Sequence, residues 1–182
     1  MDGDREFIQI VDAALAEAAR KSGAWLVCRP GCCHCCLGAF AITQLDAARL
    51  RTGLKELETS DPARAARVRQ RARDAADRME TPPSDAEFES WLESLPDDDP
   101  CPVLDPETGT CDLYAARPVT CRIFGPPVRW GGEAVGVCEL CFEGASDEEI
   151  AACEVQLDVA ALEAEIGSGG QTVVALALHS VG

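Results

Sequence analysis

Apolar residues recur at helical spacing through the first part of the chain. Within residues 6–21 they form one stripe, made of Phe7, Ile10, Val11, Ala14, Leu15 and Ala18. Positions three and four apart lie on one face of a helix, so this pattern predicts an amphipathic helix ending before Gly23. The sequence from Thr43 to Asp46 has the form of a capping box and predicts a second helix that runs to about Glu58. Asp61-Pro62 predicts the start of a third helix that reaches Met79.

The pattern becomes shorter and more irregular after Pro82-Pro83. Ser84 to Glu87 repeats the capping-box form and predicts a short helix that buries Phe88, Trp91, Leu92 and Leu95. Residues 101–104 and 111–114 are short β-like runs on either side of a turn-forming stretch. Pro118 predicts a single helical turn, and Gly131-Gly132 predicts a hairpin between two further runs.

The last part of the chain returns to helical patterns. Ser146 opens one predicted helix, Asp158 caps another that ends at Gly167, and residues 172–178 form an apolar run that predicts a buried helix. We therefore predict a mainly α fold with a small β-hairpin and loop region, forming one compact domain over residues 1–182. Its helical parts are 1–27, 42–96 and 146–182, and its cysteine-rich core is 28–41 with 97–145.

Cysteine changes this picture, because the chain has eleven and five of them lie among the nine residues 28–36. Closely spaced thiolates repel one another unless a cation lies between them. Adjacent cysteines such as Cys32-Cys33 and Cys35-Cys36 are poorly placed to form a disulfide with each other. The segment is therefore interpreted as a set of metal ligands. Core packing does not explain so dense a use of one residue type.

The net charge of −16 bears on partners and location. Nucleic acid and anionic membrane surfaces would repel such a chain, so neither is expected as a partner. The acidic start lacks the features of a secretory signal, and no run reaches the roughly 18 apolar residues of a membrane helix. We expect a cytoplasmic protein, where reducing conditions keep cysteine available for metal. The arginine-rich stretch 62–79 is interpreted as a solvated helix face that pairs with nearby acids.

Several cysteine motifs occur in a fixed order along the chain. They are Cys28-x3-Cys32-x2-Cys35-Cys36, Cys101-Pro102-x-Leu104, Gly109-x-Cys111-x-x-Tyr114, Arg117-Pro118-x-x-Cys121-Arg122-x-Phe124 and the pair Cys138 and Cys141. Together they resemble the zinc- or iron-chelating (CxxCxxCC) cysteine-cluster domain family of bacteria. The resemblance covers residues 28–36 and 101–141. It implies a cysteine-ligated metal site, and a distant branch is similar to flagellin lysine methylases, which suggests one enzymatic role.

Nine cysteines are the resulting candidate ligands: Cys28, Cys32, Cys35, Cys36, Cys101, Cys111, Cys121, Cys138 and Cys141. One tetrahedral site takes about four thiolates, so two centres or one multinuclear cluster are expected. Gly31 would let Cys28 and Cys32 face the same centre. Adjacent side chains point apart, so Cys35 and Cys36 are expected to serve different ions or different corners of one cluster.

Other residues near the motifs receive weaker assignments. Cys33 and Cys153 fall outside the family pattern, and Cys153 is interpreted as a small buried apolar residue. His34 could bind metal or lie in the outer shell of the site. Tyr114, Arg117 and Arg122 are candidates for groups that support the ligands, with ordinary salt bridges as the alternative for the two arginines.

The spacing does not choose between zinc, iron and a 4Fe–4S cluster, because all accept thiolates in a tetrahedral array. The main functional prediction is metal binding with no further role assigned. The alternatives are an iron–sulfur enzyme that modifies proteins with S-adenosylmethionine, and a metal store or chaperone. A protein partner or substrate stays open, as does enzymatic activity itself. The sequence shows no Ser/His/Asp set and no phosphate-binding glycine loop.

Overall fold

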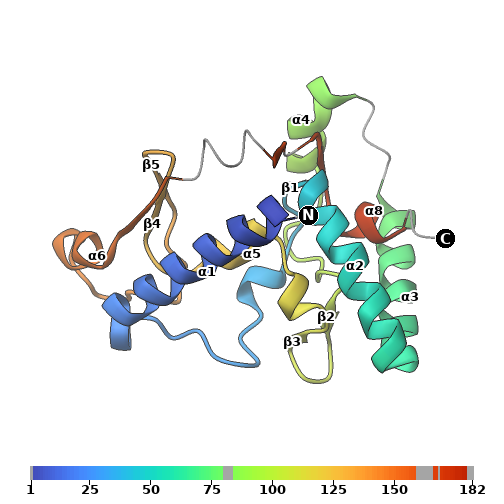
Figure 1. Cartoon of the computed structure of the whole chain (residues 1–182), viewed down its shortest axis with the longest axis horizontal. Helices are drawn as coiled ribbons and strands as arrows, with labels where there is room; N and C mark the ends of the chain where they lie inside the picture. Colours follow the sequence, from blue (N-terminus) through green and yellow to red (C-terminus); the bar gives the residue numbers. More distant parts are fainter. Residues whose placement is uncertain (1, 80–83, 159–165, 168, 180–182) are drawn as a thin grey trace. The chain divides into compact units, whose positions relative to one another are not determined.

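The computed structural model describes residues 2–79, 84–158, 166–167 and 169–179 (Figure 1). The chain divides into two compact units, and each unit is built from two stretches of sequence. Unit 1 comprises Met1–Arg29 and Val119–Ser168, and unit 2 comprises Pro30–Pro118 and Gly169–Gly182. The predicted fold class, mainly α with a small β and loop region, is confirmed. The domain boundaries proposed from the sequence stay a prediction.

Three helices form the centre of unit 2. α2 (Gln44–Ser60) and α3 (Pro62–Arg78) run side by side in opposite directions, and α8 (Val174–His179) packs against both (Figure 1). The predicted capping box of α2 is confirmed, because the Asp46 amide donates to Thr43 Oγ1 at 3.1 Å and the Thr43 amide donates to the Asp46 carboxylate. The Asp61 cap is confirmed as well. The helices bury a shared apolar core that includes Leu50, Leu54, Val68, Val174 and Leu178.

Short elements complete unit 2. β1 (Ile42–Thr43) pairs with β7 (Gln171–Thr172), and β2 (Leu104–Asp105) pairs with β3 (Thr110–Cys111), both antiparallel. The remaining pieces are the 3₁₀ turns η2 (His34–Cys36), η3 (Asp85–Glu87) and η4 (Tyr114–Ala116), and the short helix α4 (Phe88–Glu93). The capping box predicted at Ser84 is wrong. Its hydroxyl donates to the Glu87 carboxylate at 2.6 Å and caps no backbone amide.

Unit 1 combines a long helix with a small sheet. α1 (Asp2–Ser22) is followed by η1 (Gly23–Trp25), and the second stretch adds α5 (Val119–Ile123) and α6 (Asp147–Cys153). The sheet has the order β5-β4-β6, from β4 (Val128–Trp130), β5 (Glu133–Val135) and β6 (Val155–Leu157). The β4–β5 hairpin was predicted at Gly131-Gly132. The helix predicted over 158–167 lies largely outside the described residues.

The core of unit 1 lies between α1 and the sheet. Phe7 and Val11 of α1 are buried together with Val128, Val155 and Leu157 of the strands. The Phe7 ring meets the edge of Trp130 with centroids 6.2 Å apart. β6 pairs with β4 in parallel, a pairing that the sequence pattern did not predict. Because α1 from the first chain stretch packs on this sheet from the second, their shared burial joins the two stretches of unit 1.

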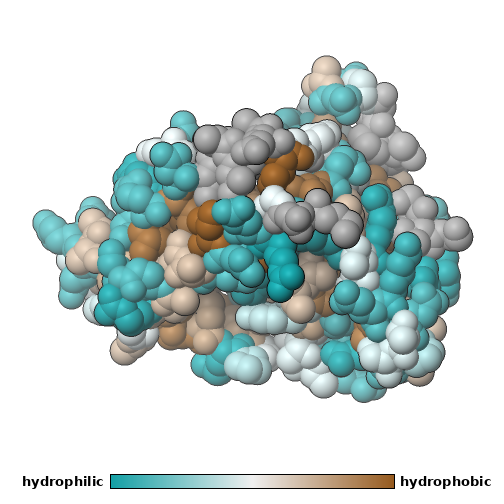
Figure 2. Space-filling model, in the orientation of Figure 1, coloured by the Kyte–Doolittle hydropathy of each residue, from teal (hydrophilic) through white to brown (hydrophobic). Residues whose placement is uncertain are grey.

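The arginines of α3 pair with acids, as the interpretation of this helix face expects. Arg64 and Arg71 both bond Asp112, and Arg78 bonds Asp99 at 3.3 Å. Hydrophilic side chains cover the outer surface along α3 (Figure 2). The Asp112 side chain is only 1% exposed, so its two partners compensate a buried negative charge. This ion pair fixes the end of the β2–β3 hairpin to α3.

Candidate metal-binding sites

A tight turn and a 3₁₀ turn present the first group of cysteines in unit 2. Gly31 has a φ of +90°, which side chains rarely adopt, and it reverses the chain just before Cys32. The Cys36 amide then donates to the Cys33 carbonyl at 2.8 Å and closes η2. Cys32 to Cys36 are all half-buried. Their sulfur atoms therefore stay near the surface of unit 2 on a compact piece of backbone.

The second group of unit 2 cysteines lies directly beside this turn. The Cys101 amide donates to the Cys36 carbonyl at 2.8 Å, and the Cys101 carbonyl accepts from the Leu104 amide at 2.9 Å. Leu104 in turn pairs with Cys111 across the β2–β3 hairpin. A Cβ at Gly109, in the hairpin turn, would lie 3.0 Å from the Gly31 carbonyl oxygen. Residues distant in sequence are thus brought into one backbone-bonded patch that carries Cys32, Cys35, Cys36, Cys101 and Cys111.

Electrostatic interactions connect four of these thiols. The side chains of Cys35 and Cys36, which were expected to point apart, instead form a hydrogen bond with each other. This bond lowers the pKa of Cys35 to about 6 and raises that of Cys36. Burial raises the pKa of Cys101 to about 12 and also raises that of Cys111. The pKa values of Cys36, Cys101 and Cys111 are each raised further by the charge of other thiolates in the group. Ionising several of these thiols at once is therefore electrostatically unfavourable, and a bound cation would remove this cost.

Arg117 is the member of the predicted supporting set whose charge acts on these thiols. Its positive charge helps to lower the pKa of Cys35 and works against the burial that raises the pKa of Cys111. Its guanidinium carbon lies 4.0 Å from the centroid of the Tyr114 ring, so the two candidate supporting residues hold each other. Arg122 has a different position. It belongs to unit 1, where its buried guanidinium donates to Asp12 at 2.6 Å.

Unit 1 carries its own group of cysteines. The Cys28 sulfur would lie 3.4 Å from a Cβ placed on Gly125, so it rests against the Gly125 backbone. The Gly125 carbonyl accepts the Cys138 amide at 3.2 Å, which brings the end of the first stretch close to Cys138. A second bond supports this approach, because the Phe142 amide donates to the Trp25 carbonyl and the two rings stack.

Cys138 and Cys141 are buried in unit 1. Their thiols interact by a hydrogen bond, and burial raises the pKa of Cys138. Both belong to an apolar cluster that also contains Phe142 and Cys153. The Cys153 thiol donates to the Lys21 carbonyl at 3.4 Å, which suits a small buried residue. Cys121 lies on α5, four positions before Gly125.

The division into units also divides the candidate ligands. Cys28, Cys121, Cys138 and Cys141 belong to unit 1, and Cys32, Cys35, Cys36, Cys101 and Cys111 belong to unit 2. Each unit therefore contains at least the four thiolates that one tetrahedral centre requires. A centre shared by Cys28 and Cys32 stays a prediction.

The donor chemistry fits zinc or iron. Both bind thiolate sulfur in tetrahedral arrangements, whereas magnesium and calcium require oxygen ligands. Among the described residues, no group of three or more His, Cys, Asp or Glu side chains already has the spacing of a metal site. The cysteines of unit 2 lie on neighbouring stretches of backbone, and in unit 1 Cys28 and Cys138 both lie beside Gly125. The sulfur atoms of each unit would have to turn inward to share one ion.

A comparison with models of known protein families shows to which family the chain belongs. The model of the CxxCxxCC family, described as a putative zinc- or iron-chelating domain, matches residues 27–138. The chain belongs to this family. The CxxCxxCC match contains eight of the nine candidate ligands and ends at Cys138, just before Cys141. Comparison with curated proteins and with solved structures finds no match.

Two residues that matter for the sites were not selected from the sequence. Asp112 anchors the hairpin that carries Cys111. In the sequence, the one feature that could have singled it out is its position directly after a candidate ligand. Gly125, against which the Cys28 sulfur lies, has a φ of +123°, a backbone conformation that residues with side chains rarely adopt. As for the membrane, none of the described helices has the length and hydropathy that a spanning helix needs.

Proposed function

We propose that this CxxCxxCC protein binds zinc or iron at two cysteine centres, one in each unit, and that these centres stabilise the parts of the fold built from short elements. The observation that carries the proposal is the hydrogen bond from the Cys101 amide to the Cys36 carbonyl. It joins the two cysteine motifs of unit 2, which are 65 positions apart in sequence, around four interacting thiols.

The secondary structure around the cysteines supports a structural role for the metal. β2 and β3 are two residues long, and η2 and η4 are single turns. Such short elements bury little apolar surface and make few backbone hydrogen bonds of their own. Where a small region has little core, the free energy of metal ligation contributes directly to folding. Four thiolates around one ion would hold these turns in their observed positions.

The first test is metal and acid-labile sulfide analysis, with a visible spectrum, on full-length protein purified without oxygen. About two zinc ions per chain, or iron at an equivalent occupancy, would support the proposal. Iron with sulfide would favour the iron–sulfur alternative, and S-adenosylmethionine binding would then be measured. Less than one tightly held metal ion per chain after purification and reconstitution would overturn the proposal of two centres.

The second test assigns the centres to the units. Cys101→Ser and Cys111→Ser should each remove about half of the metal and leave the remainder bound, since four ligands serve each ion. Cys138→Ser and Cys141→Ser should remove the other half. Cys33→Ser is the matched control in unit 2, and Cys153→Ser is the control in unit 1. Loss of all metal from any single ligand variant would instead indicate one shared cluster.

A further inference from the structure

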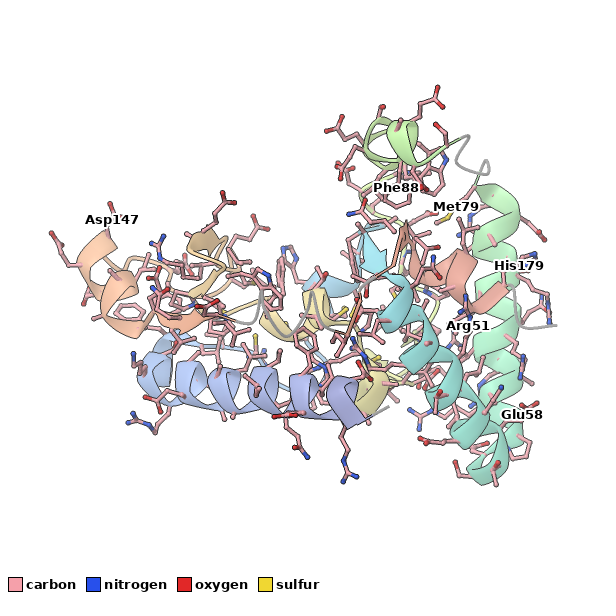
Figure 3. The ribbon with its side chains drawn as sticks, turned by 45° about the horizontal axis from the view of Figure 1, so that its top comes forward. Arg51, Glu58, Met79, Phe88, Asp147 and His179 are labelled. Atoms are coloured by element: carbon pink, nitrogen blue, oxygen red, sulfur yellow. The ribbon has the colours of Figure 1, made fainter. Side chains whose placement is uncertain are left out.

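Gly53 lies in the middle of α2, between Arg51 and Glu58, which are both labelled in Figure 3. Glycine in a helix interior destabilises the helix relative to alanine, so α2 would be more stable with alanine at this position unless a contact prevents it. Such a contact exists. A Cβ on Gly53 would lie 2.5 Å from the Ala116 Cβ, closer than Cβ atoms in proteins approach their neighbours. The missing side chain therefore allows η4 to lie directly against α2.

η4 is a single turn whose position depends on what it packs against. It begins after Leu113, whose side chain is buried in the core of unit 2, and the Ala116 amide donates to the Leu113 carbonyl at 2.9 Å. Ala116 packs against the same core. The Arg117 amide donates to the Tyr114 carbonyl at 3.4 Å and ends the turn. The close approach of Ala116 to α2 therefore helps to set the positions of the residues at both ends of η4.

The two ends of η4 both act on candidate ligands of unit 2. Before the turn, the Leu113 amide donates a hydrogen bond to the Cys111 sulfur. After the turn, the positive charge of Arg117 acts on the sulfur atoms of Cys35 and Cys111. Amide donors and cations stabilise a thiolate, and groups that support metal ligands in this way typically contribute about 10- to 100-fold to metal affinity. A displacement of η4 would move both supporting groups.

We propose that Gly53 is a positioning residue for the metal centre of unit 2. Its contact with Ala116 sets where η4 lies, and η4 in turn places the Leu113 amide and the Arg117 charge beside the ligands. This inference rests on the proposed metal centre of unit 2. The alternative is that the contact serves packing alone. Its disruption would then lower the stability of unit 2 and leave the surroundings of the ion unchanged once the ion is bound.

The first measurement is titration of full-length protein with Co²⁺ without oxygen, because Co²⁺ accepts tetrahedral thiolate ligands and absorbs visible light when it is bound. Gly53→Ala should weaken the binding of one Co²⁺ ion at least about tenfold and leave the ion of unit 1 at the wild-type affinity. Gly170→Ala is the matched control, because Gly170 lies exposed in unit 2 with open space around it. Equal affinities in the wild type and Gly53→Ala would overturn the inference alone. A wild type that binds no Co²⁺ in unit 2 would overturn the proposed function and this inference with it.

The contact itself is tested by exchanging the two side chains. Without the Ala116 Cβ, the atoms nearest to a Cβ on Gly53 are the Ala116 Cα and the Leu113 Cδ2, both at an ordinary contact distance of 4.0 Å. The double variant Gly53→Ala/Ala116→Gly should therefore bind Co²⁺ more tightly than Gly53→Ala and close to the wild type. A double variant that stays as weak as Gly53→Ala, or that does not fold, would overturn the inference. If Gly53→Ala alone does not fold, wild-type affinity in the double variant decides in its favour.

The spectrum at saturating Co²⁺ separates positioning from packing alone. A thiolate that loses an amide donor and a nearby cation becomes richer in electrons, so transfer of charge from sulfur to cobalt takes less energy. The charge-transfer band of Gly53→Ala should therefore move to longer wavelength, and Arg117→Gln, which removes the cation directly, should move it in the same direction. The double variant should show the wild-type band. A wild-type band in fully loaded Gly53→Ala would show that the contact serves packing alone and would overturn the inference.

Discussion

Asp112 shows how a single side chain can position a candidate ligand. Its carboxylate is almost fully buried and accepts from Arg64 and Arg71 of α3, while the Asp112 amide donates to the Val103 carbonyl at 2.8 Å. Arg71 also donates to the Pro102 carbonyl at 2.9 Å. Cys111 directly precedes Asp112 in the chain, so it is held in place by these hydrogen bonds between α3 and the β2–β3 hairpin. Removing the carboxylate would leave two partly buried arginines without its negative charge, and Arg71 would keep, among its described acceptors, only the Pro102 carbonyl.

We predict that Asp112→Ala lowers the free energy of unfolding by about 2 kcal/mol, since hydrogen bonds to charged groups contribute about 1.5–3 kcal/mol each and these arginines remain partly hydrated. Urea unfolding of the metal-loaded protein measures the loss. Glu58→Ala is the matched control, because Glu58 is 52% exposed and its pair with Arg69 should contribute less than about 1 kcal/mol. Equal losses in the two variants would contradict this account of Asp112.

Asp105, at the other end of the hairpin, gives a prediction about pH. The Thr108 hydroxyl and the Glu107 amide donate to its carboxylate and lower its pKa. A lowered pKa in the folded state means that the stabilisation is present above the unfolded pKa of about 4 and is lost as the pH falls through the folded value. The stability difference between the wild type and Asp105→Asn should therefore shrink between pH 6 and pH 3. A difference independent of pH would contradict the prediction.

At the scale of elements, local signals predicted the helices and the two hairpins, but they missed the strands that pair with distant partners. The capping box at Thr43 forms as predicted, and the helix predicted to open at Ser146 begins there, also with a capping box, because such a cap needs only residues three positions apart. Strands β1, β6 and β7 are two or three residues long, which is too short for an alternating pattern. Their pairing is decided by distant partners. The nine cysteines were selected from the sequence, but their division between units depends on that same distant pairing.

Thr43 and Ser84 both precede a helical segment, but only the first of these two side chains caps a backbone amide, so substituting each gives a direct comparison. Thr43→Ala should lower the free energy of unfolding by about 1 kcal/mol, because it removes the acceptor for the Asp46 amide. Ser84→Ala should cost less than about 0.5 kcal/mol, since the Ser84 hydroxyl caps no amide and lies on an exposed turn. Thermal unfolding of the two variants measures the difference. A larger effect at Ser84 would show that its bond to Glu87 does more than the structure indicates.

At the scale of the whole molecule, the cysteines divide between the units at two chain crossings. The chain passes from unit 1 to unit 2 between Arg29 and Pro30, and it returns between Pro118 and Val119. Both crossings fall between cysteines, so each unit receives its own ligands.

If each unit holds a centre, metal removal should destabilise both. We predict that a strong chelator lowers the melting temperature of the wild type more than that of Cys101→Ser, which already lacks one centre. Equal shifts would contradict two separate stabilising centres.

The interleaved connectivity also has a consequence for synthesis. β7 and α8, which complete unit 2, come from the last stretch of the chain, and α1 finds β4 and β6 only after unit 2 has mostly been translated. A nascent chain paused after Pro118 would carry every cysteine of unit 2 but lack the strand and helix that close it. During translation, these thiols are therefore exposed to the cellular metal pool before their unit has folded.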